Sequence, residues 1–472
     1  HVYREAIELY DRHIYEKGSC VYHMMRAELG DELFYKAIAT FLKDNAHSTV
    51  ETIDLLRAIE KTTGRNLLFL FDQYVYRGGH PDYKIGYSWD SESNIAKITV
   101  TQTQNELFDL RIPIAVGSVQ SDRKTFTVRV HEKEQAFYFP LEKKPDFISF
   151  DVGNHHLKTV ELDYPLPELK AQLQSDPDPI SRLYAAHAIA KKGGLEAVKI
   201  LSDALKNESF WGVRVEVVQS LATIKLDQAV EGVLLGLNDP EARVRRATVE
   251  SLGQITTPES YSALKSVVEK GDASYYVEAA ALRSFGKVAA SNLSNSSEED
   301  TLKLIESVLK ERQGWNEVVR SGAIGALSQM KTSEAALTLI LEYTQPGVPQ
   351  PLRLTSIRAL GAISTGQSNP NVERILERLK TLARETFFLT QVAVAIALGQ
   401  MQTTKAIGIL QSLANQTPDG RVRRIAEESI QDVQKNAGSD QAVKQLREEM
   451  DQLKKENQQL KSRLESLEAK AK

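Results

Sequence analysis

The spacing of apolar residues divides the chain into four regions. In residues 1–82 apolar positions recur every three or four residues, which predicts helices. In residues 83–164 they alternate with polar positions, which predicts short strands. Helical spacing returns in residues 165–436, and residues 437–472 follow a seven-residue repeat. We therefore expect a multidomain, mainly α chain: a helical region, a small antiparallel β-sandwich, an α-solenoid and a C-terminal coiled coil.

Local signals refine the first two regions. Thr49 precedes an apolar helix with an acidic first turn and is expected to cap it, and Gly64 is expected to end that helix. Residues 77–81, Arg-Gly-Gly-His-Pro, predict a domain edge. The strands named from the alternation are 95–100, 110–116, 125–130, 136–140 and 147–151. Pro113 lies within a strand and lacks an N–H group, which favours an edge position.

Residues 165–436 contain an internal repeat. Asp239 and Pro240 open the clearest copy, and a small-residue helix follows that is expected to end in left-handed geometry at Gly253. The corresponding glycines are Gly286, Gly361 and Gly399. The copies align on Arg182, Arg214, Arg245, Glu278, Arg320, Arg353, Gln391 and Arg423. One helix pair cannot bury its apolar face alone, so stacked pairs are expected. The pattern resembles HEAT-like repeats, particularly the short kind of phycobilin-lyase-type proteins.

Six arginines gather at two of the repeat helix starts. They are Arg243, Arg245, Arg246, Arg421, Arg423 and Arg424. They could form an anion-binding ridge, or they could form a solvated, salt-bridged helix face. The salt-bridged face is the interpretation we favour.

The C-terminal segment carries apolar residues at two heptad positions. Position a holds Val443, Met450, Asn457 and Leu464, and position d holds Leu446, Leu453, Leu460 and Leu467. A single Asn at a with Leu at every d favours a parallel two-stranded coil, and thus a homodimer. The alternative is a single charged helix in solvent.

Charge and composition exclude several function classes. The chain has 472 residues with 59 Lys and Arg against 63 Asp and Glu, a net charge of -4. No global field therefore attracts nucleic acid or anionic lipid. No apolar run is long enough to span a membrane. The single cysteine, Cys20, forms no internal disulfide and fits a reducing, cytoplasmic compartment. The chain opens at His1 inside a helical pattern, which indicates part of a longer protein.

No complete catalytic constellation is present in the sequence. His-Glu-x-x-His, phosphate-loop and Gly-x-Ser-x-Gly motifs are all absent. His155 and His156 are adjacent, so their side chains diverge, and they are expected on the sandwich surface.

An ordered series of short motifs nevertheless resembles the gluzincin aminopeptidases, the aminopeptidase N family. The series begins with Tyr15-Glu16-Lys17-Gly18 and continues through 29–34, 49–60, 69–75 and 79–81. The resemblance implies that residues 1–82 are the C-terminal helical part of a catalytic domain. It also implies a zinc cofactor in the full-length protein, peptide substrates, and removal of N-terminal residues from them.

Tyr15 matches the tyrosine whose hydroxyl, in that family, hydrogen-bonds the oxyanion of the tetrahedral intermediate. A phenol is neutral near pH 7 and can be aimed at charge that develops in the transition state. The family's zinc ligands, general-base glutamate and substrate loop precede this tyrosine, so this chain alone is expected to bind no zinc and to be inactive. The alternative is a non-catalytic scaffold, as in a transcription-factor relative that lost its zinc site, with a protein partner on the solenoid. A lyase acting on bilin chromophores is a third, weaker possibility.

Overall fold

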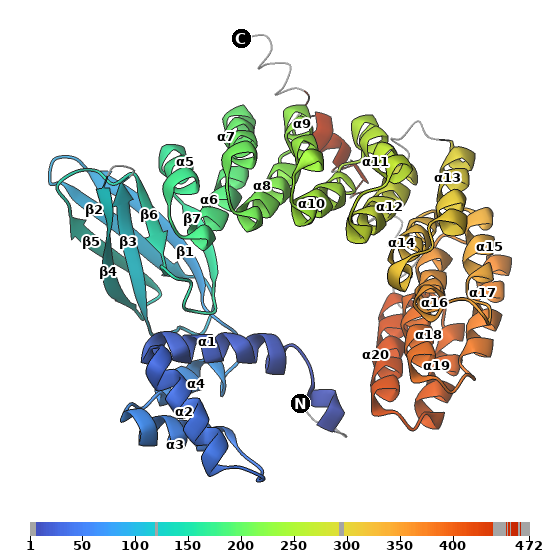
Figure 1. Ribbon diagram of the computed structural model, residues 1–472, viewed down its shortest axis with the longest axis horizontal. Coiled ribbons are helices and arrows are strands. Elements are labelled where there is room, and N and C mark those ends of the chain that lie inside the picture. The colour runs from blue at the N-terminus through green and yellow to red at the C-terminus, as the bar shows by residue number, and fades with distance from the viewer. Residues whose placement is uncertain are drawn as a thin grey trace. The chain divides into compact units, whose positions relative to one another are not determined.

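The computed structural model describes residues 6–118, 121–291, 297–437, 450, 452–453, 455–460 and 463 (Figure 1). The chain divides into two compact units, one of Leu9–Gly193 and one that contains Gly194–Lys472. The first unit holds the N-terminal helices, both β-sheets and the first repeat helices. The second holds the rest of the solenoid. The four-domain division expected from the sequence stays a prediction.

The N-terminal region consists of helices, as expected. They are η1 (Ala6–Leu9), η2 (His13–Lys17), α1 (Gly18–Leu29), α2 (Asp31–Asp44), α3 (Thr52–Thr63) and α4 (Leu68–Tyr74). Gly64 ends α3 in left-handed geometry at φ 68°, as predicted. Thr49 does not cap that helix. Glu51 does, in a capping box with Asp54, because a carboxylate at each position can accept the other's free N–H.

Seven strands form the two layers of the sandwich. They are β1 (Asp82–Asp90), β2 (Ile95–Gln102), β3 (Leu110–Ser118), β4 (Ser121–Val130), β5 (Glu134–Pro140), β6 (Phe147–Phe150) and β7 (Thr159–Asp163). One sheet has the order β5-β2-β1-β7 and the other β4-β3-β6. All five strands named from the sequence are confirmed. The antiparallel expectation fails at one place, because β7 pairs with β1 in parallel.

Pro113 lies on a central strand, so its predicted edge position is wrong. Strand β3 pairs with β4 on one side and with β6 on the other. The ladder with β6 runs only from Ile114 to Gly117. The Pro113 carbonyl accepts from the Val152 N–H at 3.1 Å, beyond that ladder. The missing N–H of Pro113 therefore removes no bond from the β6 pairing.

The repeats form pairs of helices, which confirms the solenoid. The helices are α5 (Leu166–Ser175), α6 (Pro179–Lys192), α7 (Gly194–Asn207), α8 (Trp211–Thr223), α9 (Asp227–Leu234), η3 (Leu235–Asn238), α10 (Ala242–Leu252), α11 (Pro258–Lys270), α12 (Tyr275–Ala289), α13 (Glu298–Glu311), η4 (Trp315–Glu317), α14 (Val318–Leu327), α15 (Glu334–Glu342), α16 (Gln350–Ser364), α17 (Asn369–Leu382), α18 (Phe388–Gln400), α19 (Lys405–Gln416) and α20 (Gly420–Ala437). In the second unit the even-numbered helices from α8 to α20 pack on one another in series (Figure 1).

The repeat glycines do not end helices in left-handed geometry, so that prediction is wrong. Gly253 is right-handed at φ −65°, and the other three lie inside α12, α16 and α18. They permit close helix packing instead. A Cβ on Gly361 would lie 2.3 Å from the Ala397 carbonyl oxygen, and one on Gly286 would lie 2.5 Å from Ala326. Only a residue without a side chain allows backbones to approach so closely.

The predicted capping of a helix by the aspartate of an Asp-Pro pair is confirmed in one repeat and wrong in another. Asp178 caps α6 by accepting from the Ile180 N–H at 2.9 Å. Asp239, in contrast, lies before the start of α10, where Glu241 is the capping residue. The Asp239 carboxylate accepts from the Glu241 N–H at 2.8 Å and also binds an arginine of the preceding repeat. An aspartate that bridges repeats in this way is not placed to cap the first turn.

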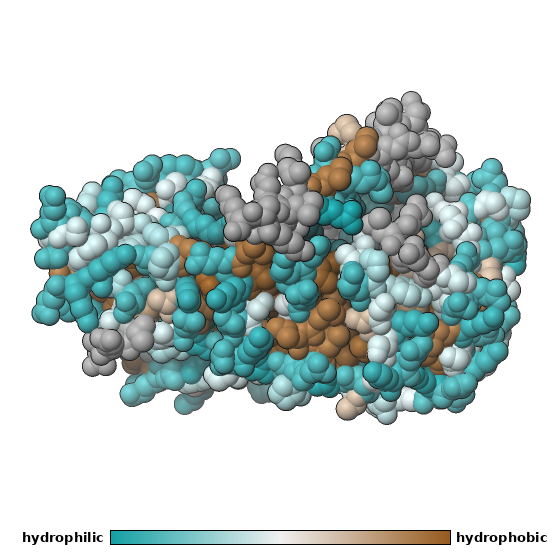
Figure 2. Space-filling model, turned by 90° about the horizontal axis from the view of Figure 1, so that it is seen from above, coloured by the Kyte–Doolittle hydropathy of each residue, from teal (hydrophilic) through white to brown (hydrophobic). Residues whose placement is uncertain are grey.

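Most of the C-terminal segment lies outside the described residues, including the heptad residues Val443, Leu446, Leu464 and Leu467. Its described heptad residues are helical, and Met450, Leu453 and Leu460 are exposed. Across the described part of the chain no helix joins the length and apolar character of a membrane span. The face in Figure 2 is largely hydrophilic, with hydrophobic residues gathered near its middle.

Candidate functional site

Tyr15 lies on η2, a single turn of π-helix that leads directly into α1. The Lys17 N–H donates to the Arg12 carbonyl at 3.0 Å, which widens the turn. Tyr15 is 58% exposed, and its ring lies 6.2 Å from that of Tyr10. Single π-turns of this kind often occur at functional sites because they reorient one side chain relative to the helix. The tyrosine is thus presented at the surface rather than buried among its own helices.

A largely apolar groove of about 420 Å³ lies beside this turn. Its lining comes from η2, α1, α2, α4 and the start of α3, and includes His13, Lys17, Tyr22, Phe41, Leu55 and Phe71. Burial lowers the pKa of Lys17 and raises that of Tyr22. Tyr15 lies on the same turn as His13, Ile14 and Lys17 but does not itself line the groove.

The described residues do not supply a zinc site. Within that part of the chain, no three His, Cys, Asp or Glu side chains gather where they could hold a metal ion. A catalytic zinc needs three protein ligands, so these residues do not fit it. Tyr15, the one site residue predicted from the sequence, is exposed on η2, and its catalytic role stays a prediction.

Sequence reasoning missed a buried charge cluster in the loop between β6 and β7. Asp151, at φ 54°, accepts from the backbone and Nδ1 of His156 at 3.0 and 2.9 Å. It also accepts from Lys158 Nζ at 2.5 Å, and the Lys158 side chain is 1% exposed. Burial would raise the pKa of Asp151, but the His156 bond and the Lys158 charge outweigh it and hold this pKa well below its usual range.

His155 and His156 are not the surface residues that we expected. The His156 side chain is 9% exposed, and Nδ1 of His155 is buried without a hydrogen-bond partner. Burial lowers the pKa of His155. His155 stacks on His23 of α1 at 6.1 Å, and Tyr74 of α4 donates to the Leu157 carbonyl at 3.1 Å. This loop therefore joins the N-terminal helices to the sandwich, a long-range role that no local motif could have indicated.

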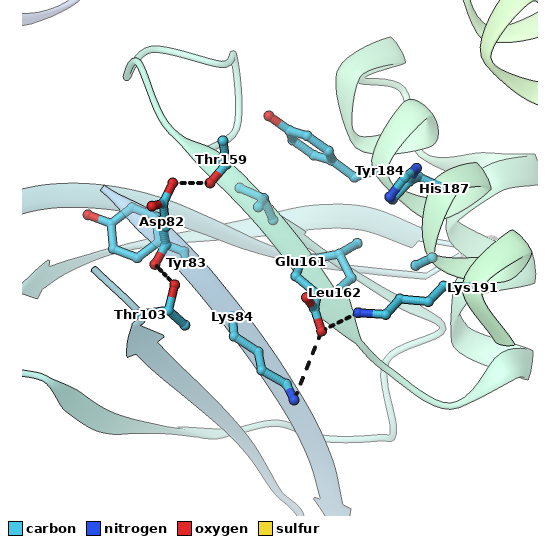
Figure 3. Close-up of a pocket in the computed structure, with 12 residues that line it drawn as sticks. Asp82, Tyr83, Lys84, Thr103, Thr159, Glu161, Leu162, Tyr184, His187 and Lys191 are labelled. Carbon is cyan, nitrogen blue, oxygen red and sulfur yellow. Dashed lines mark hydrogen bonds and ion pairs between the residues drawn. The ribbon is translucent and has the colours of Figure 1, made fainter. Parts of the chain in front are cut away.

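A small polar pocket of about 260 Å³ lies between β1, β7 and α6 (Figure 3). Lys191 binds Glu161 at 2.7 Å, and Lys84 lies 4.0 Å from the same carboxylate. Asp82 pairs with Thr159 on the opposite wall. Because these charges satisfy one another across the pocket, we assign it a structural role: it fastens α6 to the sandwich edge.

The repeat register arginines form a ladder between repeats. Arg245 binds Asp272 of the next repeat through two bonds of 2.8 Å and donates to the Asp239 carbonyl of its own loop at 2.9 Å. Arg353 binds Glu385 of the next repeat in the same way. At Glu278 the polarity is reversed, since it accepts from Arg312 at 2.8 Å.

The arginine clusters at the helix starts are salt-bridged, as we favoured. Arg246 binds Glu250, Arg424 binds Glu428, and Arg421 binds Asp419, at 2.8, 2.8 and 2.7 Å. The anion-binding alternative for these clusters is therefore not needed.

Two parts of the chain match known protein families. Residues 1–74 match the Peptidase family M1 domain, and residues 166–234, 209–286 and 339–431 match HEAT repeats. The chain is thus M1 aminopeptidase-like in its N-terminal part and carries HEAT repeats, which confirms both resemblances.

Several of the similar proteins are aminopeptidases. Aminopeptidase M1 of Arabidopsis thaliana is 34% identical over 77 residues, 16% of this chain and 9% of that protein. Aminopeptidase M1-C of Oryza sativa subsp. japonica is 24% identical over 242 residues, 47% of this chain and 27% of the relative. Aminopeptidase N of Haemophilus influenzae is 26% identical over 156 residues, 29% of this chain and 17% of the relative. The chain therefore spans well under half the length of these relatives.

One solved structure shares the fold. The aminopeptidase A of Legionella pneumophila in complex with aspartic acid matches with a TM-score of 0.51 and 14% identity, over 91% of this chain and 58% of that one. At this identity the likeness concerns the fold alone.

Proposed function

We propose that this chain is the C-terminal portion of a zinc-dependent aminopeptidase that removes N-terminal residues from peptides. The observation that carries the proposal is the match of residues 1–74 to the M1 domain, with Tyr15 exposed on a π-turn inside it. The zinc ligands belong to a part of the catalytic domain that lies outside this chain.

Exposed apolar side chains on the N-terminal helices support a contact with the zinc-bearing part of the catalytic domain. Of the 25 large apolar side chains exposed among the described residues, 13 lie between Leu9 and Tyr76. Soluble domains rarely leave so many together on one helical unit. The zinc-bearing part of the catalytic domain would cover them and complete the cleft beside Tyr15.

Within that cleft Tyr15 acts as a hydrogen-bond donor. Its hydroxyl donates to the oxyanion that forms when the scissile carbonyl becomes tetrahedral. The zinc supplies Lewis-acid chemistry when it is bound. A neutral donor held at the developing charge lowers the transition-state energy without a proton transfer of its own.

The test joins this chain to the zinc-bearing part and measures cleavage of aminoacyl-arylamides. Tyr15→Phe should lower kcat by a factor of about 10²–10³. Tyr10→Phe, the neighbouring exposed tyrosine, is the matched control and should leave kcat unchanged. Full activity of Tyr15→Phe would remove the role assigned to the phenol, and this chain alone should be inactive in either form.

A second candidate is a non-catalytic scaffold in a cytoplasmic compartment. It is favoured by the exposed leucines of the C-terminal helix, Leu453 at 59% and Leu460 at 62%. We propose that this helix forms a parallel homodimeric coiled coil and that the solenoid binds a protein partner. Intact zinc ligands in the missing part favour the enzyme, and their loss favours the scaffold.

A further inference from the structure

Two histidines connect the N-terminal helices to the sandwich. His23 of α1 and His155 of the loop between β6 and β7 have ring centroids 6.1 Å apart and ring planes 29° from parallel. Nε2 of His23 also lies 3.2 Å from the Asn154 carbonyl oxygen. A carbonyl oxygen only accepts hydrogen bonds, so this nitrogen carries a proton and donates. We call His23, Asn154 and His155 the histidine clasp.

The ring of His155 is confined at both of its nitrogen atoms. Nδ1 is buried and has no hydrogen-bond partner within the described residues. Nε2 packs over Gly153, where φ is 88° and an added Cβ would lie 2.7 Å from that nitrogen. A neutral imidazole has one N–H donor, whereas an imidazolium has two, and each buried donor without a partner costs free energy. The position therefore suits the neutral ring and disfavours the charged one.

The charged groups of the same loop and of α6 do not compensate for a proton on His155. Asp151 would attract such a proton, but its carboxylate is already committed to the His156 ring and to the Lys158 ammonium group. Asp178, at the start of α6, accepts from two backbone N–H groups, one of them in this loop. The positive charge of Lys158 opposes a second cation nearby.

His155 also lines a cavity of about 630 Å³, whose walls come from α1, α4, β3, β4 and this loop. The charged residues of the lining are Glu28, Arg65, Asp109, Arg111 and Arg129. Arg129 binds Asp109 through bonds of 2.8 and 2.6 Å, and Arg65 donates to the Glu28 carbonyl at 2.5 Å. With three arginines against two carboxylates, the lining is net positive and also opposes a proton on His155.

We propose that the histidine clasp is a pH-sensitive switch that holds the β6–β7 loop against α1 at neutral pH and releases the loop in mild acid. When both rings are protonated, two positive charges lie about 6 Å apart in a partly buried contact and repel each other. Because α1 and the loop are both walls of the cavity, release would widen the cavity. The inference holds independently of the peptidase proposal.

The direction of the pH dependence follows from the burial of His155. Burial lowers the pKa of His155 in the closed contact, whereas the released ring regains an ordinary pKa of about 6.5. The stabilisation of the closed contact is therefore complete above about pH 6.5 and is lost as pH falls below that value. Each further pH unit favours release by up to about tenfold, until the closed form is itself protonated.

The test measures hydrogen exchange of the whole chain at about pH 7.5 and 5.0, corrected for the intrinsic pH dependence of amide exchange. The protection of residues 151–158 should fall about tenfold between these two values. Strand β2, which pairs with β1 and β5, should keep its protection. The contribution of Asp151 is lost only below about pH 4, so the two steps are separate.

Two replacements of His155 identify the titrating group. His155→Phe keeps a flat ring beside His23, and His155→Gln keeps a polar side chain, but neither can be protonated in this range. Both should leave the protection of residues 151–158 equal at the two pH values, and circular dichroism at neutral pH checks that they fold. His131→Phe, which replaces an exposed histidine of the same sandwich, should keep the full response. A pH-independent loop in the unmodified chain, a full response in both His155 variants, or an equal loss of protection in β2 would overturn the proposal.

Discussion

Arg214 of α8 reaches across the repeat boundary to Asp239 and binds both of its carboxylate oxygens. The Nε–Oδ2 distance is 2.7 Å and the Nη2–Oδ1 distance is 3.0 Å, and the two side chains are 12% and 7% exposed. Nη1 of Arg214 donates to the carbonyls of Glu208 and Ser209, both at 3.0 Å. One planar guanidinium therefore holds its own loop and the next repeat in a single geometry, which an ammonium group could not reproduce.

We predict that Arg214→Ala destabilises the junction of α8 and α10 by about 3 kcal/mol, because it leaves the Asp239 charge nearly buried and unpaired. Arg214→Lys should recover little of this. The measurement is hydrogen exchange of peptides from both helices. Arg246→Ala, which breaks a pair whose members are 47% and 42% exposed, should cost under about 0.5 kcal/mol. Equal effects of Arg214→Ala and Arg246→Ala would contradict a special role for the ladder.

The sequence indicated the repeat and its register, because each repeat must bury the same face against its neighbours. It did not indicate what the glycines do. Gly361 and Gly64 look alike in sequence, yet only Gly64 has a positive φ. The difference lies in a helix that arrives from far along the chain, with Ala397 against Gly361.

In the candidate site, too, features that depend on local sequence could be predicted and features that depend on distant contacts could not. Tyr15 could be predicted as a candidate because its motif is local, and its role stays a prediction. The cluster of Asp151 and Lys158 was missed because the local sequence of a charged loop does not indicate that distant elements will bury it. Sequence reasoning therefore misses contacts between residues that are close in space but far apart along the chain.

Gly361→Ala should destabilise the solenoid by about 1–3 kcal/mol, because the new Cβ would meet backbone 2.3 Å away and cannot be accommodated by a rotamer change. Gly408→Ala in α19 is the matched control. No atom lies within 4 Å of a Cβ there, and its φ is not in the positive range, so the substitution should stabilise by about 0.5–1 kcal/mol. Urea denaturation followed by circular dichroism distinguishes the two signs. Stabilisation by Gly361→Ala would show that these helices do not need the close approach.

The Asp151 cluster predicts acid sensitivity of the sandwich. The pKa of Asp151 is depressed in the folded state, so its contribution to stability is present above the unfolded value of about 4 and is lost as pH falls from there. Hydrogen exchange in residues 147–163 should accelerate below about pH 4 in the unmodified chain.

Asp151→Asn is the informative variant for that pH dependence. It should exchange faster at pH 7, because it leaves the 1%-exposed Lys158 without its carboxylate. The difference from the unmodified chain should shrink as pH falls below about 4, because the unfolded aspartate takes up a proton there while the folded one stays ionised. A difference that is constant with pH would mean that the aspartate contributes shape rather than charge.

The C-terminal helix gives the last prediction, which concerns assembly. Leu453 and Leu460 are exposed on their helix, and between them lies the single polar heptad residue Asn457. Each exposed leucine gains about 1.5–3 kcal/mol on burial, so a second copy of the helix is the simplest cover. Sedimentation equilibrium should show a dimer, and replacing both leucines with aspartate should leave a monomer with unchanged solenoid stability. Asn457→Leu should keep association but admit assemblies larger than two, because the buried amide is what restricts the coil to two strands. A monomeric unmodified chain at high concentration would leave the helix as a single charged helix in solvent and remove the homodimer from the scaffold proposal.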